Sequence, residues 1–332
     1  MNELRDPFGR RIDYLRVSVT DWCNLRCAYC MPAGGLRWKP KADLLTRDEI
    51  ARIARAAARL GVRKVRLTGG EPLVRHDLPA LVEAIARVEG VEEISLTTNG
   101  VLLERLAAPL AGAGLSRVNI SLDTLDPAKF RRITRRGDLE RVWRGIEAAE
   151  RAGLAPVKLN TVVIRGFNDD ELGGLARLTI AKPWHVRFIE LMPVGQLGDW
   201  GGGFPAETER TLPVQEMLAR LETLGLARAD GPAGNGPARV FRIPGAQGTV
   251  GFIAPLSEHF CASCNRLRLT ADGRLRPCLL TEGEVDLSEA LRSGQNLDHL
   301  IAQAVAHKPS GHTLGQPAAP APRSRMMCQI GG

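Results

Sequence analysis

Residues 64–88, KVRLTGGEPLVRHDLPALVEAIARV, contain the unit that decides the fold. Val65 is at the centre of a short β-branched run, a glycine-rich loop follows, and Leu78 to Val88 has apolar residues at helical spacing. The same order of strand, loop and helix recurs between residues 12 and 190. Further strands are expected around Val17, Ile94, Val118, Leu159 and Phe188. Alternating strands and helices pair in parallel through right-handed crossovers, so the pattern predicts an α/β domain of about six units, fewer than the eight of a closed barrel.

Three further helices are expected between these strands. The first runs from Thr46 to Arg59 and opens with a capping box of Thr46 and Glu49. The other two are alanine-rich stretches, Leu103 to Ala113 and Leu139 to Ala152. After Glu190 the sequence becomes rich in glycine; a short helix is then expected at Val214 to Leu224, and strands at Val240 to Ile243 and Val250 to Ile253.

Polar residues occupy every second position toward the ends of the predicted strands, although buried parallel strands usually read as continuous apolar runs. They are Arg16, Ser18 and Thr20; Lys64, Arg66 and Thr68; Thr97 and Asn99; Asn119, Ser121 and Asp123; Lys158 and Asn160; and Arg187. Solvent-facing edge strands would explain one or two of these sets. The five sets of two or more residues favour a wet, cationic interior, with the intervening apolar residues packed on the outer helices.

The composition is that of a soluble globular protein, with 332 residues, 44% of them hydrophobic and 25% charged. The length suggests about two domains, or one α/β barrel with an added module. A net charge of +8 indicates an anionic partner, which leaves nucleic acid, acidic lipid and a polyphosphate metabolite open. Without a signal peptide or an apolar run long enough for a membrane helix, we expect a cytoplasmic protein with no membrane association.

Six of the seven cysteines form two triplets, which indicates metal binding rather than a disulfide framework. The triplets are C-x3-C-x2-C (Cys23, Cys27, Cys30) and C-x2-C-x13-C (Cys261, Cys264, Cys278). Three thiolates leave one coordination position of a metal centre open. The alternatives are a zinc ion completed by a distant histidine or buried structural thiols for the first triplet, and half of a zinc ribbon with His259 for the second. An iron–sulfur cluster is favoured at both.

The first triplet lies in DWCNLRCAYCMP, which resembles the signature of the radical S-adenosylmethionine superfamily, including the aromatic Tyr29 before the third cysteine. The segment from Thr68 to Pro72 is similar to the GGEP loop of that superfamily. The resemblance implies a [4Fe–4S] cluster whose fourth iron chelates S-adenosylmethionine, with Gly70 allowing close backbone approach and Glu71 meeting the ammonium group. It also implies an incomplete (β/α)6 barrel, closed by a C-terminal segment that carries a second cluster.

The second triplet lies in FCASCNRLRLTADGRLRPC, which resembles the C-terminal motif of the GTP 3′,8-cyclase family of molybdenum cofactor biosynthesis. The terminal Gly331 and Gly332 are also similar to that family. The resemblance implies a lyase with two [4Fe–4S] clusters that uses S-adenosylmethionine to convert GTP to (8S)-3′,8-cyclo-7,8-dihydroguanosine 5′-triphosphate. The implied partners are a low-potential electron donor and a downstream cyclic pyranopterin monophosphate synthase, with no nucleic acid. A homodimer is compatible with the sequence.

The same resemblance implies the site residues. Those implied to contact GTP are Arg16, Arg66, Thr97, Lys158, Arg266, Leu267 through its backbone, and Arg268, with Lys64 and Arg187 as further cationic support. Arg16, Arg266 and Arg268 are implied to be the catalytic residues. Those implied to contact S-adenosylmethionine are Tyr29, Gly70, Glu71, Ser121 and Met192. Cys328 is interpreted as a free thiol, and no histidine is assigned to catalysis.

The predicted organisation has three parts: residues 1–195 as the partial barrel, residues 196–308 with the second cluster and GTP contacts, and an extended tail over 309–332. The resemblance implies that the tail with Gly331 and Gly332 inserts beside the substrate, while the alanine- and proline-rich stretch before it departs from the family pattern.

Two other classes of protein compete with this prediction. A peptide-modifying radical enzyme would be expected to have more than three cysteines in its C-terminal part. A zinc-containing nucleic-acid-binding protein would suit the positive charge, but the basic residues follow the strand pattern and aromatic residues make up only 5% of the chain.

Overall fold

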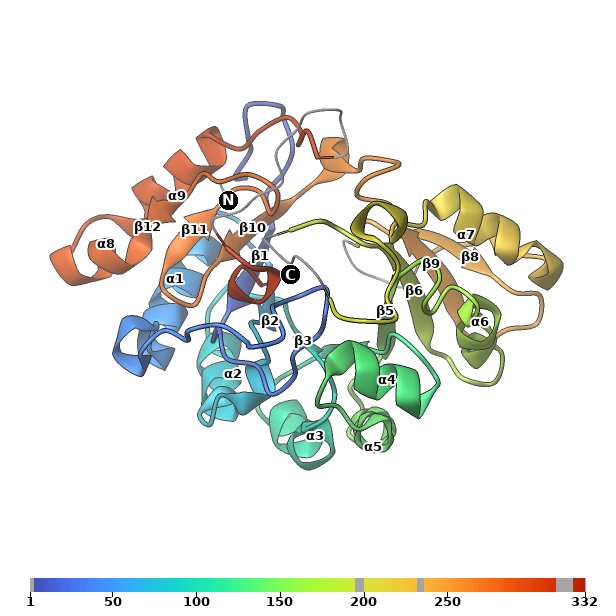
Figure 1. Ribbon diagram of the computed structural model, residues 1–332. Helices are drawn as coiled ribbons and strands as arrows, with labels where there is room; N and C mark the ends of the chain where they lie inside the picture. Colours follow the sequence, from blue (N-terminus) through green and yellow to red (C-terminus); the bar gives the residue numbers. More distant parts are fainter. Residues whose placement is uncertain (1–2, 195–199, 232–235, 315–324, 332) are drawn as a thin grey trace.

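The computed structural model describes residues 3–194, 200–231, 236–314 and 325–331. Their strands form one curved sheet in the order β12-β11-β10-β1-β2-β3-β4-β5-β6-β9-β8-β7 (Figure 1). The first six strands are β1 (Tyr14–Ser18), β2 (Lys64–Thr68), β3 (Glu93–Thr98), β4 (Arg117–Ser121), β5 (Lys158–Val163) and β6 (His185–Glu190). They pair in parallel in chain order, and each contains one of the six predicted strand centres. The predicted α/β fold with an open, parallel arrangement is confirmed.

The helices that follow these strands lie on the outer side of the sheet, except the one over residues 127–134, whose Phe130 and Thr134 line the same pocket as the first cysteine triplet (Figure 1). They are α1 (Arg47–Arg59), α2 (Leu78–Ala86), α3 (Leu103–Gly112), α4 (Pro127–Thr134), α5 (Leu139–Arg151) and α6 (Leu172–Ala181). The capping box of α1 is present, because the Thr46 hydroxyl accepts from the backbone of Glu49 and the Glu49 carboxylate accepts from the backbone of Thr46. The predicted helices α2, α3 and α5 end one or two residues earlier than expected.

The hydrophobic core lies between the sheet and these helices. Val17, Val65, Leu67, Val118 and Ile120 are completely buried in it. These are the residues that alternate with the polar ones along β1, β2 and β4, so the period of two sends apolar side chains outward to the helices and polar side chains inward. The inner side of the curved sheet is therefore available for a polar site.

The C-terminal part of the chain extends the sheet at both edges. Its elements are α7 (Val214–Arg220), β7 (Ala227–Arg228), β8 (Arg239–Arg242), β9 (Thr249–Ile253), β10 (Arg266–Leu269), β11 (Arg274–Arg276), β12 (Val285–Asp286), α8 (Leu287–Ser293) and α9 (Leu297–Ala306). Strand β9 pairs in parallel with β6, and β10 pairs in parallel with β1. Eight adjacent parallel strands result, two of them from the C-terminal part.

The open side of this arrangement is spanned by a connection rather than by strand pairing. Residues 254–265 run from β9, the last of the eight parallel strands at one end, to β10 at the other end, and within the described ranges these two strands do not pair with each other. Cys261 and Cys264 lie in this connection. The buried carboxylate of Glu190, at the end of β6, accepts from the backbone N–H groups of Leu256 at 2.9 Å and Ser257 at 3.0 Å, which fixes its starting point.

No helix within the described ranges combines the length and the apolar composition needed to cross a bilayer. Residues 315–324 lie outside the described part of the chain, so the extended conformation predicted for the tail stays a prediction there. Beyond them the prediction is wrong at Met327–Gln329, which form a 3-10 helix with Cys328 buried.

Candidate active site

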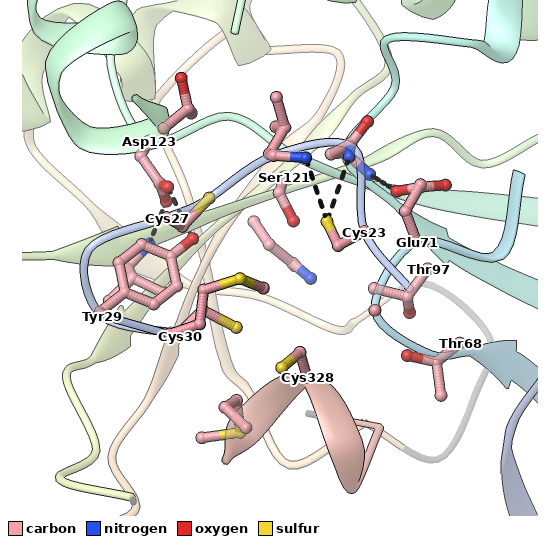
Figure 2. Close-up of a pocket in the computed structure, with 18 of the residues that line it drawn as sticks. Cys23, Cys27, Tyr29, Cys30, Thr68, Glu71, Thr97, Ser121, Asp123 and Cys328 are labelled. Carbon is pink, nitrogen blue, oxygen red and sulfur yellow. Dashed lines mark hydrogen bonds between the residues drawn. The ribbon is translucent and has the colours of Figure 1, made fainter. Parts of the chain in front are cut away.

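The first cysteine triplet forms a loop directly after β1, and its three thiols line one pocket (Figure 2). The backbone N–H of Cys30 donates to the carbonyl of Cys27 at 2.9 Å, which folds the loop back on itself. The backbone N–H of Leu25 donates to Cys23 Sγ at 3.4 Å. All three cysteines are free. The loop therefore presents three thiols to one space, as the sequence predicted.

The GGEP loop after β2 packs against the segment that leads into this triplet. The Gly70 N–H donates to the Thr20 carbonyl at 2.8 Å, and the Glu71 N–H donates to the Trp22 carbonyl at 2.7 Å. A Cβ atom at Gly70 would lie 2.3 Å from the Trp22 carbonyl oxygen, so a larger residue would push the two segments apart. Gly70 is thus required for the packing of these two backbone segments, in addition to any role in letting a ligand approach the backbone.

Two carboxyl groups beside the thiols are buried. Glu71 accepts from Thr98 Oγ1 at 2.7 Å and from the Asn99 N–H at 2.7 Å, yet burial raises its pKa to about 7. Asp123 accepts from the Tyr29 hydroxyl at 2.7 Å, and burial raises its pKa to about 6. Burial also raises the pKa of Cys23 to about 12 and that of Cys27 well above its usual value. The pocket itself disfavours the ionised forms of these acidic groups. A positively charged ligand or metal centre would stabilise the ionised forms, so the pocket favours such a ligand.

Cys328 lies beside Cys30, which the sequence did not reveal (Figure 2). The two thiols are hydrogen-bonded, and this bond, followed by burial, raises the pKa of Cys30. Cys328 forms no disulfide and is almost completely buried in the same pocket, and its exclusion from the metal ligands stays a prediction. The C-terminal segment therefore docks inside the curved sheet. It is held there by Arg268, whose Nη1 donates to the Gly331 carbonyl at 2.8 Å.

A second pocket adjoins the first and is cationic. The positively charged residues that line it are Arg16, Lys64, Arg66, Arg117, Arg187, Arg266 and Arg268. Thr97, Asn160, Ile189 and Met192 line both pockets. Because these four residues border both spaces, a ligand in one pocket can contact a ligand in the other. The predicted inward-facing cations are thus brought together next to the first triplet.

The charged forms of several basic side chains in this pocket are destabilised by burial. Burial, with Arg268 and Arg66 as further causes, lowers the pKa of Arg16 well below its usual value. Burial lowers the pKa of Arg187 to about 9 and that of Arg268 to about 10. Lys158 lines an adjoining cavity with Arg187, and burial, followed by the charges of Arg117 and Arg187, lowers its pKa to about 6. A bound polyanion would raise these pKa values again, because negative charge beside the basic groups favours their charged forms.

Several buried polar atoms in this pocket have no hydrogen-bond partner among the described residues. They are Tyr14 Oη, Thr97 Oγ1, Asn160 Oδ1, Arg187 Nε and Arg266 Nε. Buried polar groups in native proteins are nearly always paired, with protein, water or ligand. Their number and mixed donor and acceptor character fit a ligand that carries both phosphate oxygens and ring or ribose groups.

The second triplet lies at the wall of the cationic pocket. Phe260 and Leu279, the chain neighbours of Cys261 and Cys278, both line that pocket. Burial alone would raise the pKa of Cys264. The positive charges of Lys308 and Arg266 act in the opposite direction, and the net result is a pKa below the usual value. Lys308 Nζ also donates to the carbonyls of Arg266 at 2.8 Å and Pro277 at 2.5 Å, which ties β10 to the turn before Cys278. Cys264 is therefore placed to act as a thiolate ligand.

The predicted residues divide as follows. Tyr29, Gly70, Glu71, Ser121 and Met192, predicted to contact S-adenosylmethionine, all line the pocket of the first triplet. Of the residues predicted to contact GTP, five line the cationic pocket: Arg16, Arg66, Thr97, Arg266 and Arg268. Lys158 lines the adjoining cavity.

The Leu267 side chain is buried in the hydrophobic core on the opposite face of β10, so only its backbone remains available. Tyr14, Arg117 and Asn160 also line the cationic pocket and were not among the predicted contacts.

An open, parallel α/β sheet with three cysteines on the loop after its first strand defines a radical S-adenosylmethionine protein. The family model for the radical SAM superfamily matches residues 17–179, and the model described as Molybdenum Cofactor Synthesis C matches residues 184–314. The fold is similar to that of SuiB from Streptococcus suis bound to S-adenosylmethionine. That likeness has a TM-score of 0.61 at 15% identity, and it covers 85% of this chain and 65% of SuiB.

Two curated relatives narrow this class. The GTP 3′,8-cyclase of Moorella thermoacetica is 51% identical over 99% of this chain and 100% of its own length. That of Pelotomaculum thermopropionicum is 50% identical, with 99% of this chain and 100% of its own length covered. The chain belongs to the GTP 3′,8-cyclase family.

Proposed function

We propose that this chain converts GTP to (8S)-3′,8-cyclo-7,8-dihydroguanosine 5′-triphosphate, the first step of molybdenum cofactor biosynthesis. The observation that carries the proposal is the pair of adjoining pockets. One presents three thiols and buried carboxyl groups, and the other presents clustered cations with unpartnered polar atoms, while four residues border both. This arrangement suits a radical-generating cofactor in contact with a nucleoside triphosphate.

The residues of one pocket would bind the first cluster and S-adenosylmethionine, and those of the other would bind the nucleotide. Cys23, Cys27 and Cys30 would hold one [4Fe–4S] cluster, and Cys261, Cys264 and Cys278 would hold the other. When bound, the first cluster and S-adenosylmethionine supply a radical that takes a hydrogen atom from the substrate. Tyr29, Gly70, Glu71, Ser121 and Met192 would hold S-adenosylmethionine. The ammonium group of bound S-adenosylmethionine would favour the ionised form of Glu71. The pKa of Glu71, which burial raises in the free protein, would then return toward its usual value.

The cationic pocket would orient the nucleotide. Arg16, Arg266 and Arg268 are proposed as the catalytic residues, because each lines the pocket from a strand and can fix phosphate oxygens by charge-assisted hydrogen bonds. Arg66, Lys158 and Thr97 would add further contacts, together with the backbone of Leu267. Lys64 and Arg187 would contribute charge. Rigid strands suit this task, since a substrate that reacts with a radical must be held in one geometry.

We further propose that residues 1–195 form the partial barrel, that residues 196–308 carry the second cluster and GTP contacts, and that residues 309–332 form the tail. The protein would act in the cytoplasm with a low-potential electron donor. Its product would be consumed by a cyclic pyranopterin monophosphate synthase. A homodimer is consistent with this function.

The proposal is tested by incubating the reconstituted chain anaerobically with GTP, S-adenosylmethionine and a strong reductant, followed by mass analysis of the nucleotide. With unlabelled GTP the expected result is a product that has the same mass as GTP. With [3′-²H]GTP the expected product has lost the ribose 3′ deuterium. Recovery of unchanged GTP alongside full S-adenosylmethionine cleavage would overturn the proposal.

Replacing Arg268 by alanine is expected to weaken GTP binding by about 10- to 100-fold, since a hydrogen bond to a charged group contributes about 1.5–3 kcal/mol. The measurement is calorimetric titration of the reconstituted chain under anaerobic conditions. Arg274 is the matched control, because it lies on β11, is half exposed and pairs with Asp286 at 2.6 Å outside the pocket. Equal weakening in Arg268→Ala and Arg274→Ala would contradict the assignment.

GTP binding is also expected to take up a proton at Lys158. In the free protein its pKa is about 6, so at pH 8 the amine is mostly neutral, and a bound triphosphate favours the ammonium form. Affinity should therefore fall as the pH rises above about 6, until the pKa of the bound state is passed. Calorimetry in two buffers of different ionisation enthalpy measures the uptake. Lys158→Gln should abolish it, whereas Lys182→Gln, at an exposed lysine paired with Glu150, should leave it unchanged. Uptake that persists in Lys158→Gln would place the titrating group elsewhere.

A further inference from the structure

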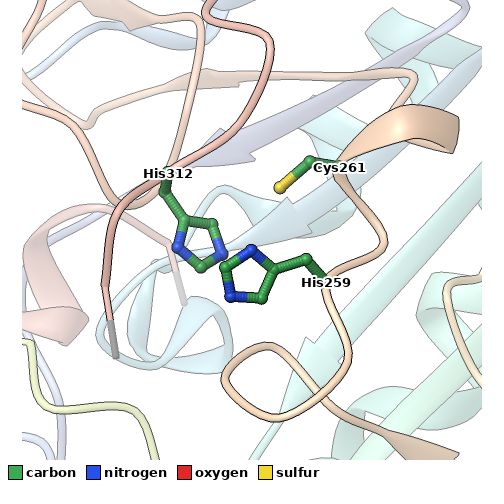
Figure 3. A group of neighbouring side chains, drawn as sticks. All are labelled: His259, Cys261 and His312. Atoms are coloured by element: carbon green, nitrogen blue, oxygen red, sulfur yellow. The ribbon is translucent and has the colours of Figure 1, made fainter. Parts of the chain in front are cut away.

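Two histidines from distant parts of the chain meet Cys261 of the second triplet. One ligand atom from each of His259, Cys261 and His312 lies within 4.8 Å of the others (Figure 3). The two imidazole rings are tilted against each other, with their centroids 4.4 Å apart. The neighbouring cysteines of the triplet, Cys264 and Cys278, are not part of this group. The cluster thus combines two imidazoles and one thiol, which are the donor groups that zinc prefers.

This juxtaposition is fixed by the surrounding backbone. Arg10 Nη1 donates to the Cys261 carbonyl at 2.7 Å and to the Ser310 carbonyl at 3.0 Å, and its Nη2 donates to the Pro309 carbonyl at 2.6 Å. One guanidinium therefore clamps the Cys261 loop to the segment that carries His312. The backbone of His312 also hydrogen-bonds to the Cys261 thiol. Arg10 is itself oriented by an ion pair with the buried carboxylate of Asp6.

The His312 ring is arranged as a ligand. Its Nδ1 is buried and has no hydrogen-bond partner among the described residues. The ring also hydrogen-bonds to the backbone of Pro255, a bond that must use the other ring nitrogen. A backbone carbonyl that binds one ring N–H fixes the neutral tautomer and leaves the lone pair of the other nitrogen free, as is usual for histidines that bind metals. The buried Nδ1 therefore keeps a lone pair without a partner among the described residues, and nothing in the proposed function uses it.

We propose that the chain without its second cluster binds one Zn²⁺ through His259, Cys261 and His312, and that this zinc excludes the second cluster because both need Cys261. Ligand atoms around tetrahedral zinc are separated by about 3.4–3.8 Å, so the three groups need to close by only about 1 Å. The Cys261 thiol proton is released to solvent on binding. Water fills the fourth position. Only the competition with the cluster rests on the proposed function.

The zinc site is tested with Co²⁺ as a spectroscopic probe on the full-length, cluster-free chain under anaerobic conditions. Cys23, Cys27 and Cys30 are replaced by serine, so that the first triplet does not contribute. The expected result is one tightly bound Co²⁺ per chain, with tetrahedral d–d bands and the charge-transfer absorption of a single thiolate, displaced by Zn²⁺. His312→Ala and His259→Ala should each weaken binding by about tenfold or more.

Matched controls separate this site from an all-thiolate site. Cys278→Ser should leave Co²⁺ affinity unchanged. His307→Ala should do the same, because the His307 imidazole, just after α9, is hydrogen-bonded to the Gln303 carbonyl at 2.8 Å. Loss of Co²⁺ binding in Cys278→Ser, with normal binding in His312→Ala, would overturn the proposal in favour of the three cysteines. Far-UV circular dichroism of each variant shows whether it remains folded. His312→Gln serves as a second substitution that keeps the polarity of the side chain.

The competition is measured separately on the chain with all its cysteines. Loading with one equivalent of Zn²⁺ before reconstitution should reduce the iron bound from about eight to about four per chain, because only the first cluster then assembles. In His312→Ala the same zinc should have little effect. A Zn²⁺-loaded wild-type chain that still binds about eight irons would refute the competition. Since Co²⁺ binding needs neither GTP nor S-adenosylmethionine, failure of the proposed function would leave the zinc result standing.

Discussion

A Cys27→Ser variant is expected to form no detectable 5′-deoxyadenosine from S-adenosylmethionine. Cys27 lies in the middle of the first triplet, and its substitution leaves the triplet with two thiols, too few for a cluster that these three cysteines hold. Chromatography with mass detection of the reduced, anaerobic reaction measures the product. The iron bound to the reconstituted variant should fall from about eight to about four per chain, because the second triplet is untouched.

The iron content makes this result specific. A variant that had merely unfolded would lose both clusters, whereas the expected variant keeps the second. Cys328→Ser is the matched control, since this cysteine is hydrogen-bonded to Cys30 in the same pocket but is predicted not to be a ligand. It should retain about eight irons per chain. Continued 5′-deoxyadenosine formation by Cys27→Ser would show that the first triplet is not the reactive centre.

A Cys264→Ser variant is expected to behave in the opposite way, cleaving S-adenosylmethionine without making the cyclic nucleotide. The variant removes a thiol whose pKa is lowered by Lys308 and Arg266 against the effect of burial, at the wall of the cationic pocket. The first pocket keeps all its residues, so cleavage should continue. Product analysis of one reaction gives both quantities, 5′-deoxyadenosine and the cyclised nucleotide.

Each of these two variants serves as the control for the other. Cyclic product from Cys264→Ser at the unmodified rate would remove any role of the second triplet in the reaction. Loss of both products from this variant, with about four irons still bound, would instead mean that the second triplet also supports the first pocket.

The repeated part of the fold could be predicted because its information is local. Alternation with a period of two placed Val17, Val65 and Val118 in β1, β2 and β4, and a capping box placed the start of α1. The placement of β9 and β10 is different. Each joins an edge of the sheet formed by residues far away in the chain, β6 or β1, and no local pattern specifies which edge it joins.

The same distinction applies to the site. Tyr14 and Arg117 line the cationic pocket, and each lies two residues before a residue that the alternation had selected, Arg16 or Asn119, so the same rule would have found both. His312 and Cys328 could not be found in this way. His312 reaches Cys261 only because Arg10 clamps the intervening segments, and Cys328 reaches Cys30 only because the C-terminal segment enters the sheet.

The inward course of the C-terminal segment has a practical consequence for handling the protein. Gly331 is buried, its backbone has a left-handed φ of 67°, and a Cβ atom there would lie 2.8 Å from the Thr68 side chain. Any peptide fused behind it would have to start from this buried position beside Arg268, whose Nη1 donates to the Gly331 carbonyl. Purification handles therefore belong at the amino end of the polypeptide, where Glu3 and Leu4 are at or near the surface.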